Sequence, residues 1–386
     1  MDISTICVHG CDKKYDTTGA VSVPIFASST FAHPGVGQST GFDYSRTQNP
    51  TKEHLEQTVT ALEGGAETIA FSSGMAAVSA LMELFSPGDH IIASYDLYGG
   101  TFRLFSHISE KNGLKFSYAA AANEIAAKIA PNTKAVIIET PTNPMMNVMD
   151  IAAVSKITQK NNLLLIVDNT FLTPVFQRPL SLGANIVLHS GTKYLGGHND
   201  ALGGMLTVKD NDPAERLRFI AKTTGAVLSP FDSFLIIRGI KTLAVRMEHH
   251  NKSALAVAKW LARGTSPQEI NQNKIKKVFY IGLQEHPDYE VSCRQASGFG
   301  GMISFSVDSE QTAKSILENV KMIKYAESLG GTESLITYPL LQTHADLPQS
   351  EREARGINGC LLRLSVGLEA AEDIIADLKQ AMEIRK

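Results

Sequence analysis

The stretch that decides the fold is Gly183-Ala-Asn-Ile-Val-Leu-His-Ser-Gly-Thr-Lys-Tyr-Leu-Gly-Gly-His-Asn-Asp-Ala-Leu-Gly-Gly-Met205. Residues 186–188 form a short apolar run that is typical of a buried strand. The chain then changes to Ser-Gly-Thr-Lys at 190–193, where α/β proteins place ligands. A lysine chosen at random is a solvated surface residue. Lys193, however, has small neighbours after a buried strand, and desolvation there lowers the pKa of an amine and makes it nucleophilic.

A second apolar run, Leu163 to Val167, ends in Asp168-Asn169-Thr170. It predicts another buried strand with a carboxylate at its end. Pyridoxal phosphate needs an amine for its aldehyde and an anion for its ring nitrogen. Lys193 and Asp168 are therefore a candidate pair for this cofactor.

Composition limits the classes of function. The chain has 386 residues, 43% hydrophobic and 19% charged, which predicts a globular protein of two packed domains. A net charge of -3 gives no electrostatic case for nucleic acid or an anionic membrane. No apolar run approaches the roughly 20 residues of a membrane span, and no signal-peptide pattern is visible, so we expect a cytoplasmic protein. Cys7 and Cys11 lack the spacing of a metal site, and we expect free thiols.

Helical and strand patterns alternate through the first two thirds of the chain. Such repeated units predict an α/β fold with a mostly parallel sheet sandwiched by helices. No Gly-x-Gly-x-x-Gly follows the first strand, so a nicotinamide site has no support. The predicted strands are 68–71, 90–95, 114–119, 135–139, 163–167 and 184–189, and the predicted helices are 53–62, 75–85, 101–111, 123–129 and 151–160.

The two ends of the chain differ from this pattern. Too few apolar residues lie in 1–48 to bury a core, so this segment must pack on another surface. A long helical stretch, Ser233 to Ala262, predicts a bridge into a second, smaller α+β domain. The predicted parts are an N-terminal arm at 1–48, a cofactor-binding domain at 49–243 and a C-terminal domain at 244–386.

Two further features each allow two interpretations. The small residues 72–77 between a strand and a helix form either a phosphate seat or merely a tight turn. Arg363 lies in the apolar strand 361–366, which is either an edge strand with a solvated arginine or a strand that points a guanidinium into a cleft to bind a carboxylate. From composition alone, Arg46 is an ordinary surface arginine.

Together the motifs resemble those of the cysteine/methionine-metabolism family of pyridoxal-phosphate enzymes. The family includes cystathionine γ-synthase, cystathionine γ-lyase, cystathionine β-lyase, methionine γ-lyase and O-acetylhomoserine sulfhydrylase. The matching motifs are Tyr44-Ser45-Arg46, Ser72-Ser73-Gly74-Met75, Tyr98-Gly99-Gly100-Thr101, Glu139-Thr140-Pro141-Thr142-Asn143-Pro144, Val167-Asp168-Asn169-Thr170-Phe171, Lys193-Tyr194-Leu195-Gly196-Gly197-His198, Ala326-Glu327-Ser328-Leu329-Gly330-Gly331 and Arg363-Leu364-Ser365-Val366-Gly367.

The resemblance implies the fold of the fold-type I pyridoxal-phosphate enzymes and a role for each matching residue. Lys193 resembles the lysine that binds the cofactor aldehyde as an imine and later shuttles protons. Tyr98 resembles the ring-stacking tyrosine, whose phenol could also take a proton from the incoming amine. The other residues that resemble cofactor contacts are Asp168 and Thr170 near the ring, and Gly74, Met75, Ser190 and Thr192 around the phosphate.

The resemblance also implies substrate contacts and an oligomer. Asn143, the backbone of Ser328 and Arg363 resemble the residues that bind the substrate carboxylate. Tyr44 and Arg46 resemble residues that reach the phosphate of a neighbouring subunit, so the implied assembly is a homotetramer built from catalytic dimers. No metal is implied.

Within the family, three positions narrow the reaction. Gly100 stands where methionine γ-lyases carry a cysteine, and Arg103 is similar to cystathionine synthases and γ-lyases rather than sulfhydrylases. Glu327 stands where β-lyases and methionine γ-lyases usually have an apolar or aromatic residue, and its carboxylate suits the distal ammonium of cystathionine. The stretches 229–233 and 338–344, the latter including Thr343, favour cystathionine γ-synthase. The γ-lyase is the alternative, followed by the other members and by a non-catalytic fold relative.

Overall fold

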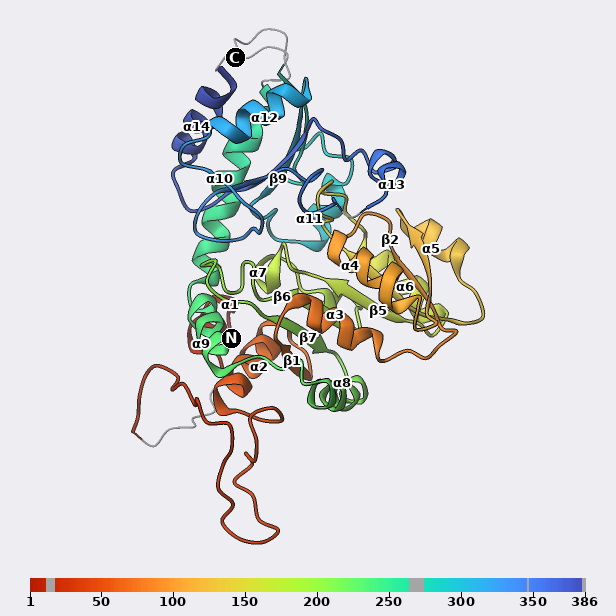
Figure 1. Cartoon of the computed structure of the whole chain (residues 1–386), viewed down its shortest axis with the longest axis vertical. Coiled ribbons are helices and arrows are strands. Elements are labelled where there is room, and N and C mark those ends of the chain that lie inside the picture. The colour runs from red at the N-terminus through yellow and green to blue at the C-terminus, as the bar shows by residue number, and fades with distance from the viewer. Residues whose placement is uncertain (12–17, 264–273, 346, 384–386) are drawn as a thin grey trace.

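The computed structural model describes residues 1–11, 18–263, 274–345 and 347–383. Figure 1 shows a large domain around one sheet and a second domain, at the top of the view, around another. This arrangement confirms the predicted α/β class with a separate C-terminal α+β part. The boundaries at 48/49 and 243/244 stay a prediction. Within the described ranges, no helix has both the length and the apolar composition needed to cross a membrane.

The large sheet has seven strands in the order β1-β7-β6-β5-β4-β2-β3. Strands β6, β5, β4, β2 and β3 pair in parallel, whereas β7 is antiparallel to both of its neighbours. The prediction of a mostly parallel sheet is therefore confirmed, although β7 itself was not predicted. The strands are β1 Glu67–Phe71, β2 His90–Ser94, β3 Lys115–Ala119, β4 Thr133–Glu139, β5 Leu164–Asp168, β6 Ile186–Ser190 and β7 Gly204–Val208.

Helices cover both faces of this sheet, which explains why its central strands are mostly apolar. Ile166 and Ile186 pack toward α3 and α8, while Leu165 and Val187 pack toward α5 and α6 on the other face. The helices are α2 Pro50–Glu63, α3 Gly74–Met82, α4 Gly99–Leu104, α5 Ala122–Lys128, α6 Ile151–Lys160, α7 Thr173–Phe176 and α8 Asn211–Thr224, with a π-helix at Phe105–Ser109 and a 3₁₀-helix at Pro179–Leu182.

The C-terminal domain contains a five-stranded sheet in the order β10-β11-β12-β9-β8. Strand β12 lies between two partners and the side chain of Arg363 is 1% exposed, so the interpretation as an edge strand with a solvated arginine is wrong. The elements are β8 Ile275–Phe279, β9 Met302–Val307, β10 Lys324–Tyr325, β11 Leu335–Thr337, β12 Leu361–Ser365, α11 Tyr289–Gln295, α12 Glu310–Asn319, α13 Gln349–Ala354 and α14 Ala371–Glu383.

The single helix predicted from Ser233 to Ala262 is two helices, α9 Pro230–Ile240 and α10 Leu243–Arg263. The side chain of Arg246 donates to the carbonyl oxygen of Gly239 over 2.7 Å and to Thr242 Oγ1 over 3.1 Å. The guanidinium thereby donates to a backbone carbonyl near the end of α9, a position where a further helical turn would otherwise supply the donor. Since the break is stabilised by a side chain further along the chain, no local proline or glycine pattern revealed it.

The N-terminal segment begins with a helix that was not predicted, α1 Ile3–His9, whose Cys7 is buried against the rest of the protein. From 18 to 48, the described residues form no helix or strand, and in Figure 1 they extend away from the large domain as an arm. This shape agrees with the low apolar content of the segment. Within the described residues neither Cys7 nor Cys11 forms a disulfide, and Cys11 Sγ lies 3.3 Å from His54 Nδ1.

Candidate active site

A cavity of about 230 Å³ lies where the parallel strands of the large sheet end and the C-terminal domain covers them. Concave sites at this edge of an α/β sheet are the usual places for ligands. Most of the side chains that the sequence singled out share its wall. These are Gly74, Met75, Tyr98, Asn143, Asp168, Thr170, Ser190, Thr192, Lys193, Glu327, Ser328, Thr343 and Arg363.

Lys193 lies three residues beyond the end of β6. Its Nζ donates to Ser328 Oγ over 2.9 Å. Burial, and secondarily the positive charge of Arg363, lowers the pKa of Lys193 to about 8, although Glu327 opposes this shift. An amine with this pKa is partly unprotonated near neutral pH, as a nucleophile for an aldehyde must be.

Asp168 ends β5 and is fixed by Thr170. The backbone N–H and the hydroxyl of Thr170 donate to Asp168 Oδ1 over 3.0 and 2.5 Å. The hydroxyl oxygen of Thr170 in turn accepts from the backbone N–H of Ser190 over 3.0 Å, which joins β5 to β6. Burial raises the pKa of Asp168, although the Thr170 bonds and His189 oppose the shift. A cationic ring nitrogen beside this carboxylate would stabilise its charged form.

The start of α3 provides a candidate phosphate site. The N–H groups of Gly74 and Met75 lie in the first turn, where they have no partner within the helix. A Cβ on Gly74 would lie 3.1 Å from the Cβ of Ser190, so glycine allows β6 and the helix start to approach closely. Thr192 Oγ1, on the same wall, accepts from Gly203 N over 3.1 Å. Backbone donors, hydroxyls and the helix dipole together suit a phosphate.

Arg363 is held by three acceptors. Its Nη1 donates to Asn143 Oδ1 over 2.9 Å, and its Nη2 donates to the carbonyl of Ser328 over 2.9 Å and to Thr337 Oγ1 over 3.1 Å. Its Nε has no partner within the described residues. Burial lowers the pKa of Arg363 to about 10, and the neighbouring Tyr98 opposes this shift. A buried, partly unpaired guanidinium in a cavity suits a substrate carboxylate.

Ser328 links this arginine to the lysine. It has a positive φ of 86°, which is unusual for a residue other than glycine. In this conformation its hydroxyl contacts Lys193 while its carbonyl contacts Arg363. The sequence predicted only its backbone as a substrate contact, and its contact with Lys193 was missed.

Glu139 is a further cavity residue whose side chain was not predicted to matter. It ends β4, and its register partner in β5 is Asp168. Burial, and secondarily the charge of Asp168, raises the pKa of Glu139 well above its usual value. A carboxylate at a strand end was the signal that identified Asp168, and the same signal was present at Glu139.

Three predicted residues lie outside this cavity. Arg103 is exposed near the end of α4, and Tyr44 is exposed on the arm. Arg46 donates to the carbonyl oxygen of Lys222 over 2.6 Å and lines a second cavity, of about 1070 Å³. Their predicted contacts, with the substrate for Arg103 and with a neighbouring subunit for Tyr44 and Arg46, stay predictions.

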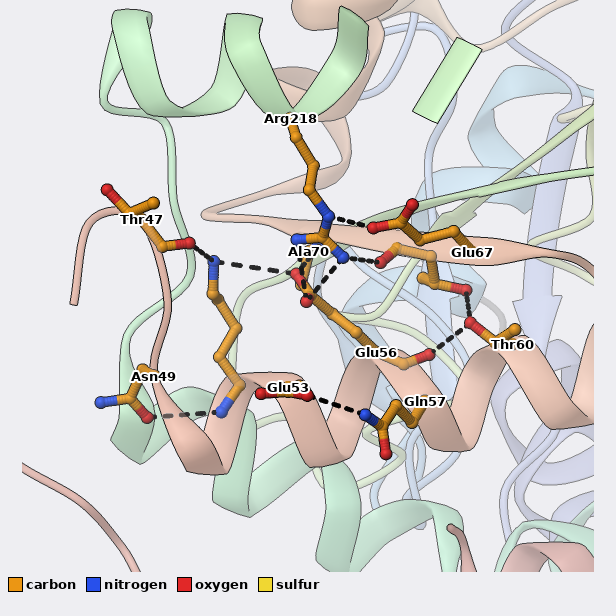
Figure 2. Close-up of polar contacts among 11 residues, drawn as sticks. Thr47, Asn49, Glu53, Glu56, Gln57, Thr60, Glu67, Ala70 and Arg218 are labelled. Carbon is orange, nitrogen blue, oxygen red and sulfur yellow. Dashed lines mark hydrogen bonds and ion pairs between the residues drawn. The ribbon is translucent and has the colours of Figure 1, made fainter. Parts of the chain in front are cut away.

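The wall of the second cavity includes a cluster of paired charges, which we name the Lys52 cluster: Lys52, Glu56, Glu67 and Arg218. Figure 2 shows Arg218 pointing from α8 toward Glu56 and Glu67. Lys52 Nζ lies 3.7 Å from Glu56 Oε1, and Arg218 Nη1 lies 3.2 Å from Glu56 Oε2. These contacts join α2, β1 and α8.

The family model described as "Cys/Met metabolism PLP-dependent enzyme" matches residues 4–383. The chain belongs to this family. It is 49% identical over 383 residues to cystathionine gamma-synthase of Haemophilus influenzae, covering 98% of this chain and 97% of that protein. It is 46% identical over 383 residues to cystathionine beta-lyase of Lactococcus lactis subsp. cremoris, covering 99% of each chain.

Among solved structures, cystathionine gamma-lyase from Lactobacillus plantarum complexed with L-serine is similar with a TM-score of 0.93. The identity is 42%, and the match covers 99% of this chain and 98% of that chain. The family and fold predicted from the motifs are thereby confirmed. These relatives are named as three different cystathionine enzymes, a gamma-synthase, a beta-lyase and a gamma-lyase, so family membership alone does not select one reaction.

The cofactor of the family is pyridoxal phosphate, and the cavity residues fit it. Lys193 would hold its aldehyde, Asp168 its ring nitrogen, and the start of α3 its phosphate. When bound, the cofactor supplies an electron sink for charge that develops on the substrate. In that arrangement the lysine would be placed to move protons, the carboxylate would favour a charged ring nitrogen, and the arginine would orient the substrate.

Proposed function

We propose that this protein is a cystathionine γ-synthase, which joins an activated homoserine to cysteine and releases the activating acid. The observation that supports cystathionine as the product is Glu327, an exposed carboxylate at the wall of the cavity, and the stretches 229–233 and 338–344 favour the synthase over the lyase. It lies close enough to Lys193 and Arg363 to influence the pKa values of both. Cystathionine carries an amino-acid group at each end, and Glu327 suits the distal ammonium when Arg363 binds the proximal carboxylate.

The roles proposed for the other residues are those that the family resemblance implies, and the contacts of the cavity residues support them. Lys193 takes up and returns protons within the cavity, and Ser328 holds its Nζ in place. Tyr98 stacks on the cofactor ring, while Asn143 and Arg363 bind the substrate carboxylate. Tyr44 and Arg46 complete the phosphate site of a second copy of the chain, so we propose a homotetramer built from catalytic dimers, in the cytoplasm.

Gly100 supports the choice against methionine γ-lyase. A Cβ at this position would lie 2.5 Å from Cε1 of the Tyr98 ring, which is too close for the present ring position. A cysteine at this position, as methionine γ-lyases carry, would therefore require the Tyr98 ring to move. Cystathionine γ-lyase remains the second candidate. Glu327 would bind the distal ammonium of cystathionine equally well whether cystathionine is the product of a synthase or the substrate of a lyase.

Steady-state assays test this function. A γ-synthase should form cystathionine from cysteine plus O-acetyl- or O-succinyl-homoserine faster than it degrades cystathionine. Rapid release of 2-oxobutanoate from cystathionine would instead show a γ-lyase, and release of pyruvate would show a β-lyase. If the purified chain showed no visible absorbance of an internal imine after incubation with pyridoxal phosphate and removal of the unbound cofactor, it would be a non-catalytic relative.

A further inference from the structure

Glu139 occupies a central position among the cavity residues. It is the last residue of β4, its register partner is Asp168, and both carboxylates line the cavity. Its backbone N–H donates to Ser94 Oγ over 3.1 Å, which also ties it to the end of β2. The side chain is therefore fixed at the point where three parallel strands end.

Each carboxylate oxygen of Glu139 holds a different loop. Oε2 accepts from the backbone N–H of Tyr98 over 2.8 Å, and Oε1 accepts from the backbone N–H of Asn143 over 2.8 Å. One loop follows β2 and the other follows β4. A carboxylate has two oxygens that only accept, whereas glutamine has one acceptor and one donor group. The two acceptor oxygens of a glutamate match these two backbone donors, whereas a glutamine would place a donor group against one of them.

The position also has an electrostatic cost. Glu139 and Asp168 are adjacent acids, and in the described chain neither forms an ion pair with a lysine or arginine. Burial, followed by the charge of Asp168, raises the pKa of Glu139, although the two backbone N–H bonds oppose the shift. A cationic ring nitrogen at Asp168 would reduce the repulsion between the two acids. A bridge between two loops explains why an acid is placed here in spite of this cost.

We propose that Glu139 is a positioning residue that bridges the Tyr98 and Asn143 loops and so fixes the ring of Tyr98 relative to the amide of Asn143. This inference rests on the proposed roles of Tyr98 toward the cofactor and Asn143 toward the substrate. Glu139 acts through these two residues.

Two variants of Glu139 and one control test the bridge. Glu139→Gln keeps the size but removes one acceptor, and Glu139→Asp keeps the charge but is one methylene too short to reach both loops. The control is Glu124→Gln. Glu124 lies on helix α5, outside the cavity, and its Oε2 also accepts from a backbone N–H, that of Ala120, over 3.0 Å. Far-UV circular dichroism of each apoprotein establishes that it is folded.

The readouts are the affinity of the apoprotein for pyridoxal phosphate, the visible circular dichroism of the bound cofactor, and KM and kcat for the amino-acid substrate. Losing one of two buried hydrogen bonds should weaken cofactor affinity about tenfold in both Glu139 variants. The circular dichroism per bound cofactor should fall, and KM should rise more than kcat falls. Glu124→Gln should match the wild-type protein in all three.

Two results would overturn the inference. Wild-type affinity and circular dichroism in Glu139→Asp would show that charge rather than a bridge is required, and this variant is decisive even where Glu139→Gln fails to fold. Loss of affinity without change in circular dichroism or KM in both variants would show a general structural role. If the wild-type apoprotein itself binds no pyridoxal phosphate, the failure lies with the proposed function instead.

Discussion

The active-site cavity and the Lys52 cluster both bury charges against the same sheet, but they pair them differently. In the Lys52 cluster, the Glu56 carboxylate lies between Lys52 and Arg218. Although burial lowers the pKa of Arg218, Glu56 and Glu67 raise it above its usual value. In the cavity, Lys193 is beside Arg363 and Asp168 is beside Glu139. Burial lowers the pKa of Lys193 and raises the pKa of Asp168, and both shifts favour the neutral form.

This difference separates charges that stabilise from charges that react. A buried charge with an opposite partner resists titration, whereas a buried charge beside a like charge is held ready to gain or lose a proton. The cavity therefore costs stability and supplies chemistry, and the Lys52 cluster joins α2, β1 and α8. Substitutions should affect function in the first region and stability in the second.

The largest effect is expected for Lys193→Ala. The substitution should abolish activity and the visible absorbance of the internal imine, because the only amine proposed to bind the cofactor aldehyde is removed. Thermal stability of the apoprotein should change little, because the lysine is a desolvated cation beside Arg363. Absorbance spectra, turnover and a melting curve test this expectation. Turnover at the wild-type rate would disprove the proposed site.

Arg46 should connect the two regions across a subunit boundary. It lies beside the Lys52 cluster in its own chain, yet we propose that it serves the phosphate site of a neighbour. Arg46→Ala and Lys193→Ala should each be inactive alone. Random exchange in an equal mixture makes half of the dimers hybrids with one intact site each, so about one quarter of wild-type activity should return.

The mixing experiment needs verified subunit exchange, for example by native mass spectrometry of differently labelled chains. A mixture that exchanges fully and stays inactive would mean that Arg46 acts within its own subunit. Mixing wild-type chains with Lys193→Ala chains provides the upper limit for the recovered activity.

In the Lys52 cluster, Glu56→Gln should affect stability more than function. The side chains of Lys52 and Glu56 are each 4% exposed, so the substitution leaves a buried cation without its partner. The free energy of unfolding should fall by about 3 kcal/mol. Urea denaturation measures this loss, and kcat in the absence of urea should stay within about threefold of the wild type, since no proposed catalytic contact involves Glu56.

A matched control is Glu310→Gln. Glu310 also pairs with a lysine one turn away, Lys314 at 2.8 Å, but both side chains are about half exposed, at 53% and 48%. This exposed pair should contribute less than about 0.5 kcal/mol. Equal losses in Glu56→Gln and Glu310→Gln would show that burial does not distinguish the two pairs.

The sequence predicted those site residues that follow apolar strands directly. Lys193 and Asp168 were found because a strand end is visible as a change from apolar to polar residues. Arg363 was ambiguous, since only the sheet order shows that its strand is interior. Thr337 was missed because β11 has three residues, too few for a pattern. Glu139 ends a predicted strand as Asp168 does, but its bonds to the two loops involve backbone groups, which every residue carries, so the sequence did not show its role as a bridge.

The same limit applies to the fold. Parallel strands and their helices were predicted from local periodicity, which a single element carries by itself. Strand β7 was not predicted because it follows a glycine-rich loop and returns antiparallel to β6. The division between α9 and α10 depends on Arg246, whose contact with Gly239 spans the gap between the helices. Features that depend on contacts between elements are invisible to a reading of one segment at a time.

The smallest effect is expected for Glu327→Val, which tests whether the cavity selects substrates with a second ammonium. Because Glu327 is exposed, its ion pair with the distal ammonium of cystathionine is worth roughly 0–1 kcal/mol. KM for cystathionine should therefore rise about twofold to fivefold, and kcat should fall less than KM rises, since the lost contact is mainly ground-state binding. O-acetylhomoserine lacks this ammonium, so its turnover without thiol should hardly change. Equal losses on both substrates would mean that Glu327 supports the cavity wall, and the choice of cystathionine as substrate would then lose the residue on which it depends.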